Sequence, residues 1–322
     1  MRIAPLTLAT ALSLGAPALA QDPPRLGFPV DCTLGETCFL QQFMDRDPGP
    51  GARAFDCGPQ SYDGHTGTDI RLVDFAAMAS GVAVLSAAPG TVRAVRDGVP
   101  DGGTPAMPEG QGCGNGVVLA HADGWETQYC HLMEGSLIVA AGDRVETGTP
   151  LGMIGYSGTT EFPHLEFLLR RNGEWVDPFD PSDLNQCGAG AAALWDPPLS
   201  NPGGGILSIG FANGLPDFDA IQNGEVRSGR LNVFGDALVL WGYVHGARAG
   251  DILRLVITDA EGAAVFTQDV ALDRTQAQMF RAGGRRTPDA GWPAGVYRGA
   301  VTLMRGDATI DQATTTVILT RD

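Results

Sequence analysis

Two short segments rich in strand-forming residues, and the turn between them, decide the fold class: GVVLA at residues 116–120, HADG at 121–124 and WETQY at 125–129. Valine, tryptophan, threonine and tyrosine favour extended backbone, and a short glycine-bearing turn between two such runs predicts a β-hairpin. Cys113 and Cys130 flank this hairpin almost symmetrically. They are therefore expected to face each other across the two strands and to form a disulfide.

The remainder of the chain also consists of short apolar runs separated by turn-forming residues. Its 322 residues include 45 glycines and 22 prolines, which divide the apolar sequence into short runs rich in valine, isoleucine, leucine and threonine. Long helical periodicity is missing, so we predict an all-β protein. The strands expected up to about residue 187 are 81–88, 91–96, 116–120, 125–129, 151–155 and 164–170.

A change of composition predicts a second domain. Residues 188–205 are rich in alanine, glycine and proline, which is typical of a linker between a first domain, 21–187, and a second, 206–322. Regularly spaced strands in the second domain predict an immunoglobulin-like β-sandwich with Trp241 in its core. It has no cluster of titratable residues, so a structural or docking role is expected, and an exposed aromatic such as Trp292 would suit a cell-wall or protein partner. The strands expected there are 231–234, 237–244, 252–258, 264–270, 295–304 and 313–320.

The charged residues exclude several classes of function. The formal net charge is −16, and all 21 basic residues are arginine. Without a lysine the chain cannot form a Schiff base, use a phosphate-loop lysine or carry a lipoyl or biotinyl group. The acidic balance also argues against nucleic acid as a partner, because polyanions bind to cationic surfaces.

The first 20 residues predict export. They carry one arginine, then an apolar run, and then Ala18-Leu19-Ala20, which is the pattern of a signal peptide cleaved after Ala20. No later run reaches the roughly 20 apolar residues of a membrane-spanning helix, so no membrane span is expected. The mature protein should be periplasmic or secreted.

The six cysteines fit an oxidising compartment, in which an even number predicts disulfides. Cys32 and Cys38 are expected to close a small loop, which leaves Cys57 to pair with Cys187 by elimination. Only the pair that flanks the hairpin has positional support, since six cysteines allow many pairings.

Candidate metal ligands occur in the segment DGHTGTD at residues 63–69. His65 and Asp69 are four residues apart between flexible glycines, so they could wrap one metal ion from a loop; zinc accepts imidazole nitrogen and carboxylate oxygen. A glycine-rich turn with a hydrogen-bonded histidine and aspartate would have the same sequence.

Two further segments carry histidines of interest. His131 ends the second strand of the hairpin, where it could project at a sheet edge. His164 and Glu166 open another strand, and the period of two places them on one face while Leu165 and Phe167 point into the core. A solvated sheet face is the alternative interpretation. The other two histidines, His121 and His245, are expected to be surface or structural residues.

These segments resemble a known family. The H-x-x-x-D segment at 65–69, Y-x-H-L at 129–132, a glycine series over 145–155 and P-H-x-x-F at 163–167 follow one another as in lysostaphin/LytM-type zinc endopeptidases, the duplicated hybrid motif peptidoglycan peptidases. The resemblance covers about residues 64–180. It implies a LytM-like β-sheet or barrel-sandwich-hybrid catalytic domain that uses one zinc ion per chain. It also implies an exported metalloendopeptidase that hydrolyses peptide bonds in peptidoglycan cross-links, with stem peptides as partners.

The resemblance also implies roles for single residues. His65 and Asp69 would be metal ligands, and His131 and His164 would be the catalytic imidazoles. The strand motif of the family is His-x-His, and its second histidine is the third ligand. Glu166 stands at that position here.

This departure changes the charge of the site. One histidine, one aspartate and zinc leave one net positive charge, which an anionic Glu166 would neutralise, so the metal would acidify water less strongly. Alternatively, Glu166 lies beside the ligands, or the metal is lost and the domain binds cell wall or regulates another cell-wall hydrolase. We favour a third metal ligand, because the other four positions are all retained.

Overall fold

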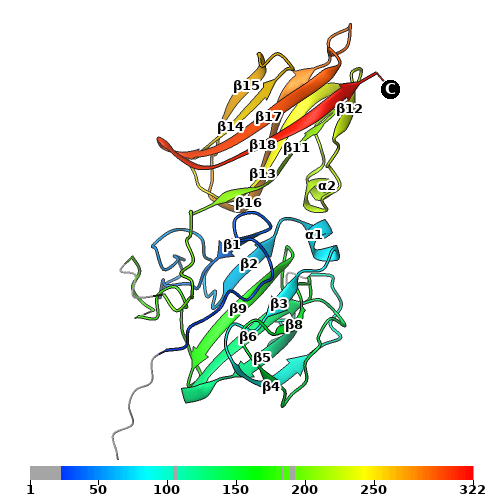
Figure 1. Ribbon diagram of the computed structural model, residues 1–322. Coiled ribbons are helices and arrows are strands. Elements are labelled where there is room, and N and C mark those ends of the chain that lie inside the picture. The colour runs from blue at the N-terminus through cyan, green and yellow to red at the C-terminus, as the bar shows by residue number, and fades with distance from the viewer. Residues whose placement is uncertain (1–22, 104–106, 183, 189–192, 322) are drawn as a thin grey trace, which may run out of the picture.

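The predicted hairpin is present as β5 (Asn115–Ala120) and β6 (Trp125–Leu132), joined by a 3₁₀ turn at Ala122–Gly124. The computed structural model describes residues 23–103, 107–182, 184–188 and 193–321. The predicted signal peptide lies outside these residues. Figure 1 shows two β-rich parts, the N-terminal one below and the C-terminal one above.

The N-terminal part is built on an antiparallel sheet with the strand order β1-β2-β9-β6-β5-β4-β7, in which β10 also pairs with β9. A second, two-stranded sheet is formed by β3 and β8. The elements besides the hairpin are β1 (Cys38–Gln42), β2 (Thr68–Leu72), α1 (Phe75–Ala79), β3 (Ala83–Leu85), β4 (Gly90–Arg96), β7 (Arg144–Val145), β8 (Pro150–Met153), β9 (His164–Arg171) and β10 (Glu174–Trp175).

Strand β9 shows how the sequence positions the core. Leu165, Phe167 and Leu169 alternate along it and are fully buried, in the same apolar cluster as Leu26 and Trp195. The intervening residues therefore point to the other face, as the period-two pattern predicted. The predicted strands 91–96, 116–120, 125–129 and 164–170 match β4, β5, β6 and β9 closely.

The sequence did not predict β2, because its five residues, TDIRL, include an aspartate and an arginine. All five are nevertheless buried. Asp69 therefore lies on a strand, and the expectation that His65 and Asp69 share one loop is wrong for Asp69. The strand is stabilised by pairing with β1 and β9 on its two sides, which no local sequence pattern records.

The C-terminal part is a sandwich of two sheets, β11-β13-β16 and β12-β18-β17-β14-β15, which confirms the predicted architecture. Its elements are β11 (Gly205–Ala212), α2 (Phe218–Gln222), β12 (Arg230–Asn232), β13 (Ala237–Ala247), β14 (Ile252–Thr258), β15 (Ala264–Ala271), β16 (Gln276–Arg286), β17 (Gly295–Arg305) and β18 (Ala308–Thr320).

Two tryptophans of the sandwich differ from expectation. Trp241 is buried, but it packs with Phe39 of the N-terminal part rather than in the centre of the sandwich. Trp292 is half-buried and packs against the sandwich core, so it is not the exposed aromatic platform that a docking role suggested. Leu194 and Trp195, inside the stretch predicted as a linker, are buried in the N-terminal core.

All three predicted disulfides are present. Cys113–Cys130 bridges the region of the hairpin, and Cys32–Cys38 closes a short loop. Cys57–Cys187 joins two segments that are 130 residues apart and so ties the end of the N-terminal part to its beginning.

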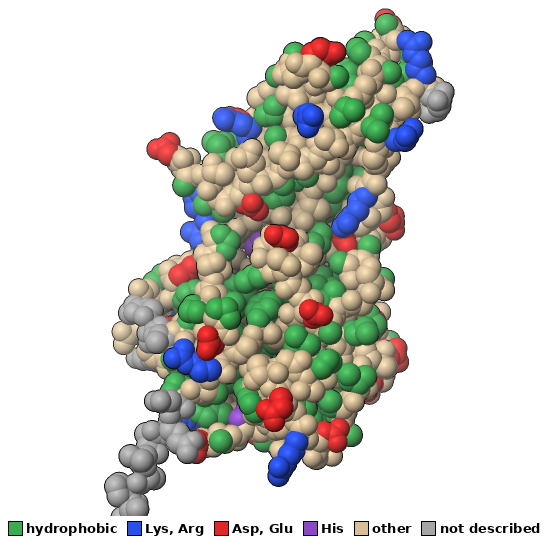
Figure 2. All heavy atoms as spheres, viewed as in Figure 1, with side chains coloured by type: hydrophobic (Ala, Val, Ile, Leu, Met, Phe, Trp, Pro, Cys, Tyr) green, Lys and Arg blue, Asp and Glu red, His purple; other side chains and the backbone are tan. Residues whose placement is uncertain are grey.

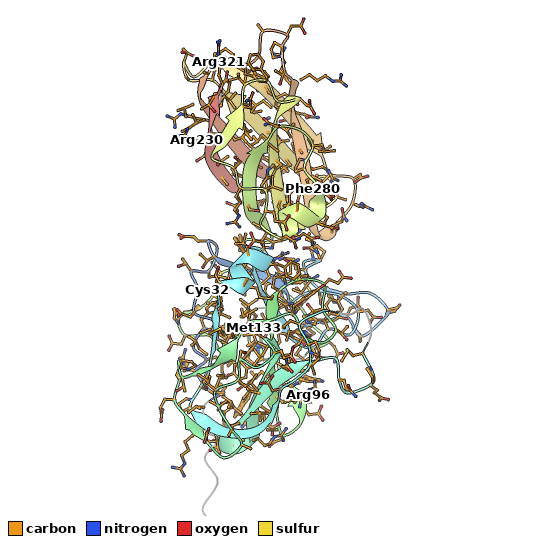
Figure 3. The ribbon with its side chains drawn as sticks, turned by 90° about the vertical axis from the view of Figure 1, so that its right-hand side faces the viewer. Cys32, Arg96, Met133, Arg230, Phe280 and Arg321 are labelled. Atoms are coloured by element: carbon orange, nitrogen blue, oxygen red, sulfur yellow. A yellow bond between two sulfur atoms is a disulfide. The ribbon has the colours of Figure 1, made fainter. Side chains whose placement is uncertain are left out.

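The two parts meet around Arg71, which is 1% exposed. Its guanidinium donates to the Tyr243 hydroxyl at 3.0 Å and to Gln278 Oε1 at 3.1 Å, both in the sandwich. Gln41 Nε2 donates to the carbonyl oxygen of Ala277. Figure 3 shows Phe280 at the end of the sandwich that faces this junction. A buried cation, hydrogen bonds and an apolar cluster therefore join the two parts.

Two features of the described residues concern the kind of partner the protein could bind: the distribution of surface charge and the apolarity of its helices. On the face shown in Figure 2, basic and acidic side chains are interspersed rather than gathered into a basic patch. In the part of the chain that the structure describes, no helix has the length and apolarity needed to cross a membrane.

His245 lies at the same junction. It is 2% exposed, its ring is 5.3 Å from that of Phe39, and neither ring nitrogen has a hydrogen-bond partner among the described residues. Burial, and then the charge of Arg71, lower the pKa of His245 to about 3. The imidazole is therefore neutral in the folded protein at pH 7.

The buried His245 predicts a loss of stability in acid. The pKa of His245 is about 3 in the folded protein and about 6.5 in the unfolded chain. Between pH 6.5 and pH 3 only the unfolded chain takes up a proton at this residue, so the free energy of unfolding decreases as the pH is lowered. Between pH 7 and pH 4.5 this histidine should cost about 2 to 3 kcal/mol. Thermal unfolding of His245→Phe and His245→Leu should show a smaller drop in Tm over that range than the unchanged protein. Equal drops would contradict the assignment.

Candidate metal centre and groove

The pairing of β2 with β9 assembles the centre. In this antiparallel register Asp69 is opposite Glu166, and Arg71 is opposite His164. Residues opposite each other or two apart on paired strands project from the same face of a sheet. The pairing thus brings two carboxylates, an imidazole and a guanidinium to one face.

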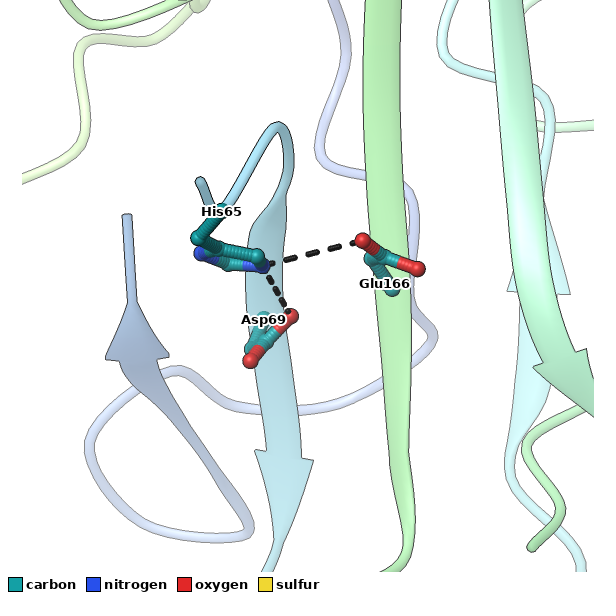
Figure 4. Close-up of side chains that lie close together, drawn as sticks. All are labelled: His65, Asp69 and Glu166. Atoms are coloured by element: carbon teal, nitrogen blue, oxygen red, sulfur yellow. Dashed lines mark hydrogen bonds and ion pairs between the residues drawn. The ribbon is translucent and has the colours of Figure 1, made fainter. Parts of the chain in front are cut away.

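His65 completes a set of three candidate ligands from the loop before β2. Its Nδ1 lies 2.8 Å from the carbonyl oxygen of Phe43, which can only accept, so Nδ1 carries a hydrogen. Its Nε2 faces Asp69 Oδ1 at 3.1 Å and Glu166 Oε1 at 3.7 Å, as Figure 4 shows. The Phe43 carbonyl therefore fixes the ring with Nε2 directed at both carboxylates.

This donor set fits a divalent metal ion such as zinc. The ligand atoms of His65, Asp69 and Glu166 all lie within 4.8 Å of one another. Zinc bonds of 2.0–2.2 Å in a tetrahedron place ligand atoms about 3.4 Å apart, and the two distances from His65 Nε2 lie on either side of that value. Three protein ligands would leave a fourth position open, as in catalytic zinc sites.

His131 and His164 lie beside the three candidate ligands. Nδ1 of His131 donates to the Ser157 carbonyl at 2.8 Å, and Nδ1 of His164 donates to the Phe162 carbonyl at 2.9 Å. Their Nε2 atoms lie 3.5 Å from Glu166 Oε2 and 3.6 Å from Asp69 Oδ1, respectively. The structure thus brings all five predicted residues together.

His131 does not lie at a sheet edge, contrary to the prediction, because β6 is flanked by β5 and β9. Its backbone has a φ of 63°, in the left-handed region, and its N–H donates to the Cys113 carbonyl at 2.8 Å. This conformation is uncommon for a histidine and is held by the neighbouring segment. This backbone conformation helps to direct the His131 ring toward the candidate metal ligands.

Burial and the two carboxylates pull the pKa values of the imidazoles in opposite directions. Burial lowers the pKa of His65, but the charge and hydrogen bond of Asp69 outweigh it and raise this pKa to about 9. For His131 the same opposition ends in a raised pKa, chiefly through Glu166. Burial prevails at His164 and lowers its pKa to about 4. The carboxylates therefore attract positive charge, which a metal ion would supply.

Four of these residues, Asp69, His131, His164 and Glu166, line a groove of about 710 Å³. Tyr62, which sequence reasoning missed, is part of its wall; its ring stacks on His65 at 4.3 Å and is 51% exposed. In the sequence, the one indication that Tyr62 lies at the site is its position three residues before His65. Ala277 lines the groove as well, so the C-terminal sandwich forms part of the wall.

Two carboxylates and two imidazoles line one groove, and a third imidazole is directed at the carboxylates. This set has the make-up of a metal-dependent hydrolase site. Comparison with known families agrees with this class. Residues 63–178 match the model of Peptidase family M23, which confirms the resemblance seen in the sequence.

The curated relatives match over short segments. The DD-carboxypeptidase/endopeptidase Mpg of Neisseria meningitidis is 40% identical over 67 residues, which are 21% of this chain and 15% of that protein. The cell division protein DipM of Caulobacter vibrioides is 34% identical over 103 residues, 32% of this chain and 15% of that protein. The match therefore spans only a small part of either relative.

Among solved structures, a mutant catalytic domain of the prophage-encoded M23 protein EnpA from Enterococcus faecalis is similar to this chain. The sequence identity is 25% and the TM-score is 0.31, and the match covers 43% of this chain and 88% of that domain.

Removal of a ligand should remove the metal. We expect Asp69→Ala to lower the zinc content from about one ion per chain to a small fraction, because one of three protein donors is lost. Elemental analysis of purified protein measures this. Asp63→Asn is the matched control, since this exposed carboxylate of the same loop is outside the ligand set. Unchanged metal in Asp69→Ala would place the ion elsewhere.

Proposed function

We propose that this protein is an exported zinc metalloendopeptidase that hydrolyses peptide bonds in peptidoglycan cross-links. The observation that carries the proposal is the convergence of three candidate metal ligands, His65, Asp69 and Glu166, with two imidazoles that line the groove, His131 and His164. The match of residues 63–178 to a peptidase family supports hydrolysis of peptide bonds. The names of the relatives, an endopeptidase and a cell division protein, support the cell wall as the location of the substrate.

His65, Asp69 and Glu166 would hold the zinc ion. When bound, zinc supplies Lewis acidity that polarises a carbonyl group and acidifies water. Buried groups fix the three donors before the ion arrives: the Phe43 carbonyl holds His65, and the β2–β9 register holds the two carboxylates. Such preorganisation lowers the cost of forming the site.

His131 and His164 would move protons. Each has its Nδ1 bound to a backbone carbonyl, so each directs its Nε2 toward the centre. A neutral imidazole can accept a proton from the attacking water at Nε2, and the other, when protonated on both nitrogens, can donate a hydrogen bond to the oxygen that gains charge. Their rings are 4.6 Å apart, so one peptide group can meet both.

Loss of one of these imidazoles should slow hydrolysis. We expect His131→Ala to lower the rate about 100- to 10,000-fold while zinc stays bound, because the ring contributes to the reaction and not to the ligand set. Release of new amino groups from purified peptidoglycan measures the rate, and the enzyme adds no lysine amines to the signal. His121→Gln, a histidine outside the groove, is the control. Equal rates for His131→Ala and the unchanged protein would exclude this role.

A second candidate function is a domain that has lost its metal and binds cell wall or regulates another hydrolase. The observation that favours it is the ion-pair network, in which His65 contacts both carboxylates and His131 contacts Glu166. These contacts balance charge within the protein alone. The C-terminal sandwich could then add a docking surface for cell wall or for a protein partner.

The substitution Glu166→His separates the two functions. A histidine leaves the same face of β9 and restores one positive charge to the loaded site, so an active enzyme should cleave faster or show a lower pH optimum. The pH profile of amine release, together with zinc content, measures this. Absence of zinc and of cleavage in both proteins would support the metal-free function. Loss of existing activity would make Glu166 the general base instead.

A further inference from the structure

We propose that Arg170 binds a carboxylate of the substrate and so makes the groove selective for an anionic peptide. The inference rests on the proposed function, since it concerns the substrate of the same site. Glu166, Leu168 and Arg170 alternate along one face of β9, and all three line the groove. Four residues of antiparallel strand place Arg170 about 13 Å along β9 from Glu166. An extended peptide of about four residues would bridge that distance.

The guanidinium of Arg170 is held in place without being neutralised. It lies 3.9 Å from the ring centroid of Trp175, its partner on β10, and its Nη2 donates to Gln128 Oε1 at 2.9 Å. Glu126 is opposite Arg170 on β6, but its carboxylate is paired with Arg93 at 2.5 Å. Within the described residues no carboxylate lies within ion-pair distance of Arg170. Most of its N–H donors are left for a ligand.

The charges of the groove give this arginine its selectivity. The other charged residues of the lining, Asp69, Glu161 and Glu166, are acidic, and Arg170 is the one arginine among the described lining residues. At the loaded metal centre the two acids balance the charge of the ion, so a substrate carboxylate gains little there, whereas at Arg170 it would meet a planar guanidinium that binds carboxylates in a bidentate manner. The groove therefore favours a substrate with a free carboxylate at its Arg170 end.

The chain offers a matched control for this proposal. Arg171 is the next residue on β9 and points to the opposite face, where it lies over Trp125 at 5.1 Å. It does not line the groove. Arg171→Gln therefore makes the same change of charge on the same strand without touching the groove, and Arg170→Lys keeps the charge.

The test compares two substrates, a cross-linked stem-peptide dimer with free carboxylates and the same dimer with its carboxylates amidated. The unchanged protein should cleave the free form with a kcat/KM about tenfold or more above the amidated form. Arg170→Gln should abolish this preference by raising KM for the free form, while its cleavage of the amidated form stays as it was. Arg170→Lys should restore part of the preference, and Arg171→Gln should leave it intact.

Binding of both dimers, measured by calorimetry, keeps the two proposals separate. If neither dimer is cleaved, peptidase action fails, yet weaker binding of the free form to Arg170→Gln would still support the carboxylate site. If both are cleaved equally, or if Arg170→Gln changes both dimers alike, the peptidase function stands and the role of Arg170 is overturned.

Discussion

The register between β2 and β9 is the constraint on which the site depends. It sets Asp69 opposite Glu166 and Arg71 opposite His164, with Ile70 and Leu165 fully buried on the other face. A slip of β2 by one residue against β9 would turn Asp69 toward the core and Ile70 away from it, which would bury a charge and expose an apolar side chain. The hydrophobic core thus determines where the polar groups converge, and the site needs no separate scaffold.

Local sequence patterns predicted the features that neighbouring residues determine, and they missed the features that depend on segments distant in the sequence. Alternation in β9 indicated that His164 and Glu166 share a face, and the symmetry of Cys113 and Cys130 about the hairpin indicated their bridge. By contrast, β2 carries polar residues because both of its neighbours bury it, which a window of five residues cannot show. The geometry of His131 depends on the backbone of another segment. Pairing in space, rather than local preference, determines both.

Glu166 gives the centre its particular balance of charge. Its carboxylate lies between His65 and His131, 3.7 Å and 3.5 Å from their Nε2 atoms, and so contacts both the ligand side and the imidazole side of the site. A neutral histidine there would offer no negative charge to pair with either imidazole. Glu166 thus couples the proposed binding of a metal ion to the protonation of His131, so a change in one of these properties should alter the other.

The contact at Arg71 limits which substitutions the junction between the two parts can accept. Its guanidinium is buried and uses the Tyr243 hydroxyl and the Gln278 side chain of the other domain in place of a carboxylate. Loss of either acceptor would leave a buried cation short of hydrogen bonds, which is costly. Mutations at these three positions therefore have to be compensated together. A sandwich exchanged from another protein would be tolerated only if it brought its own acceptors for Arg71.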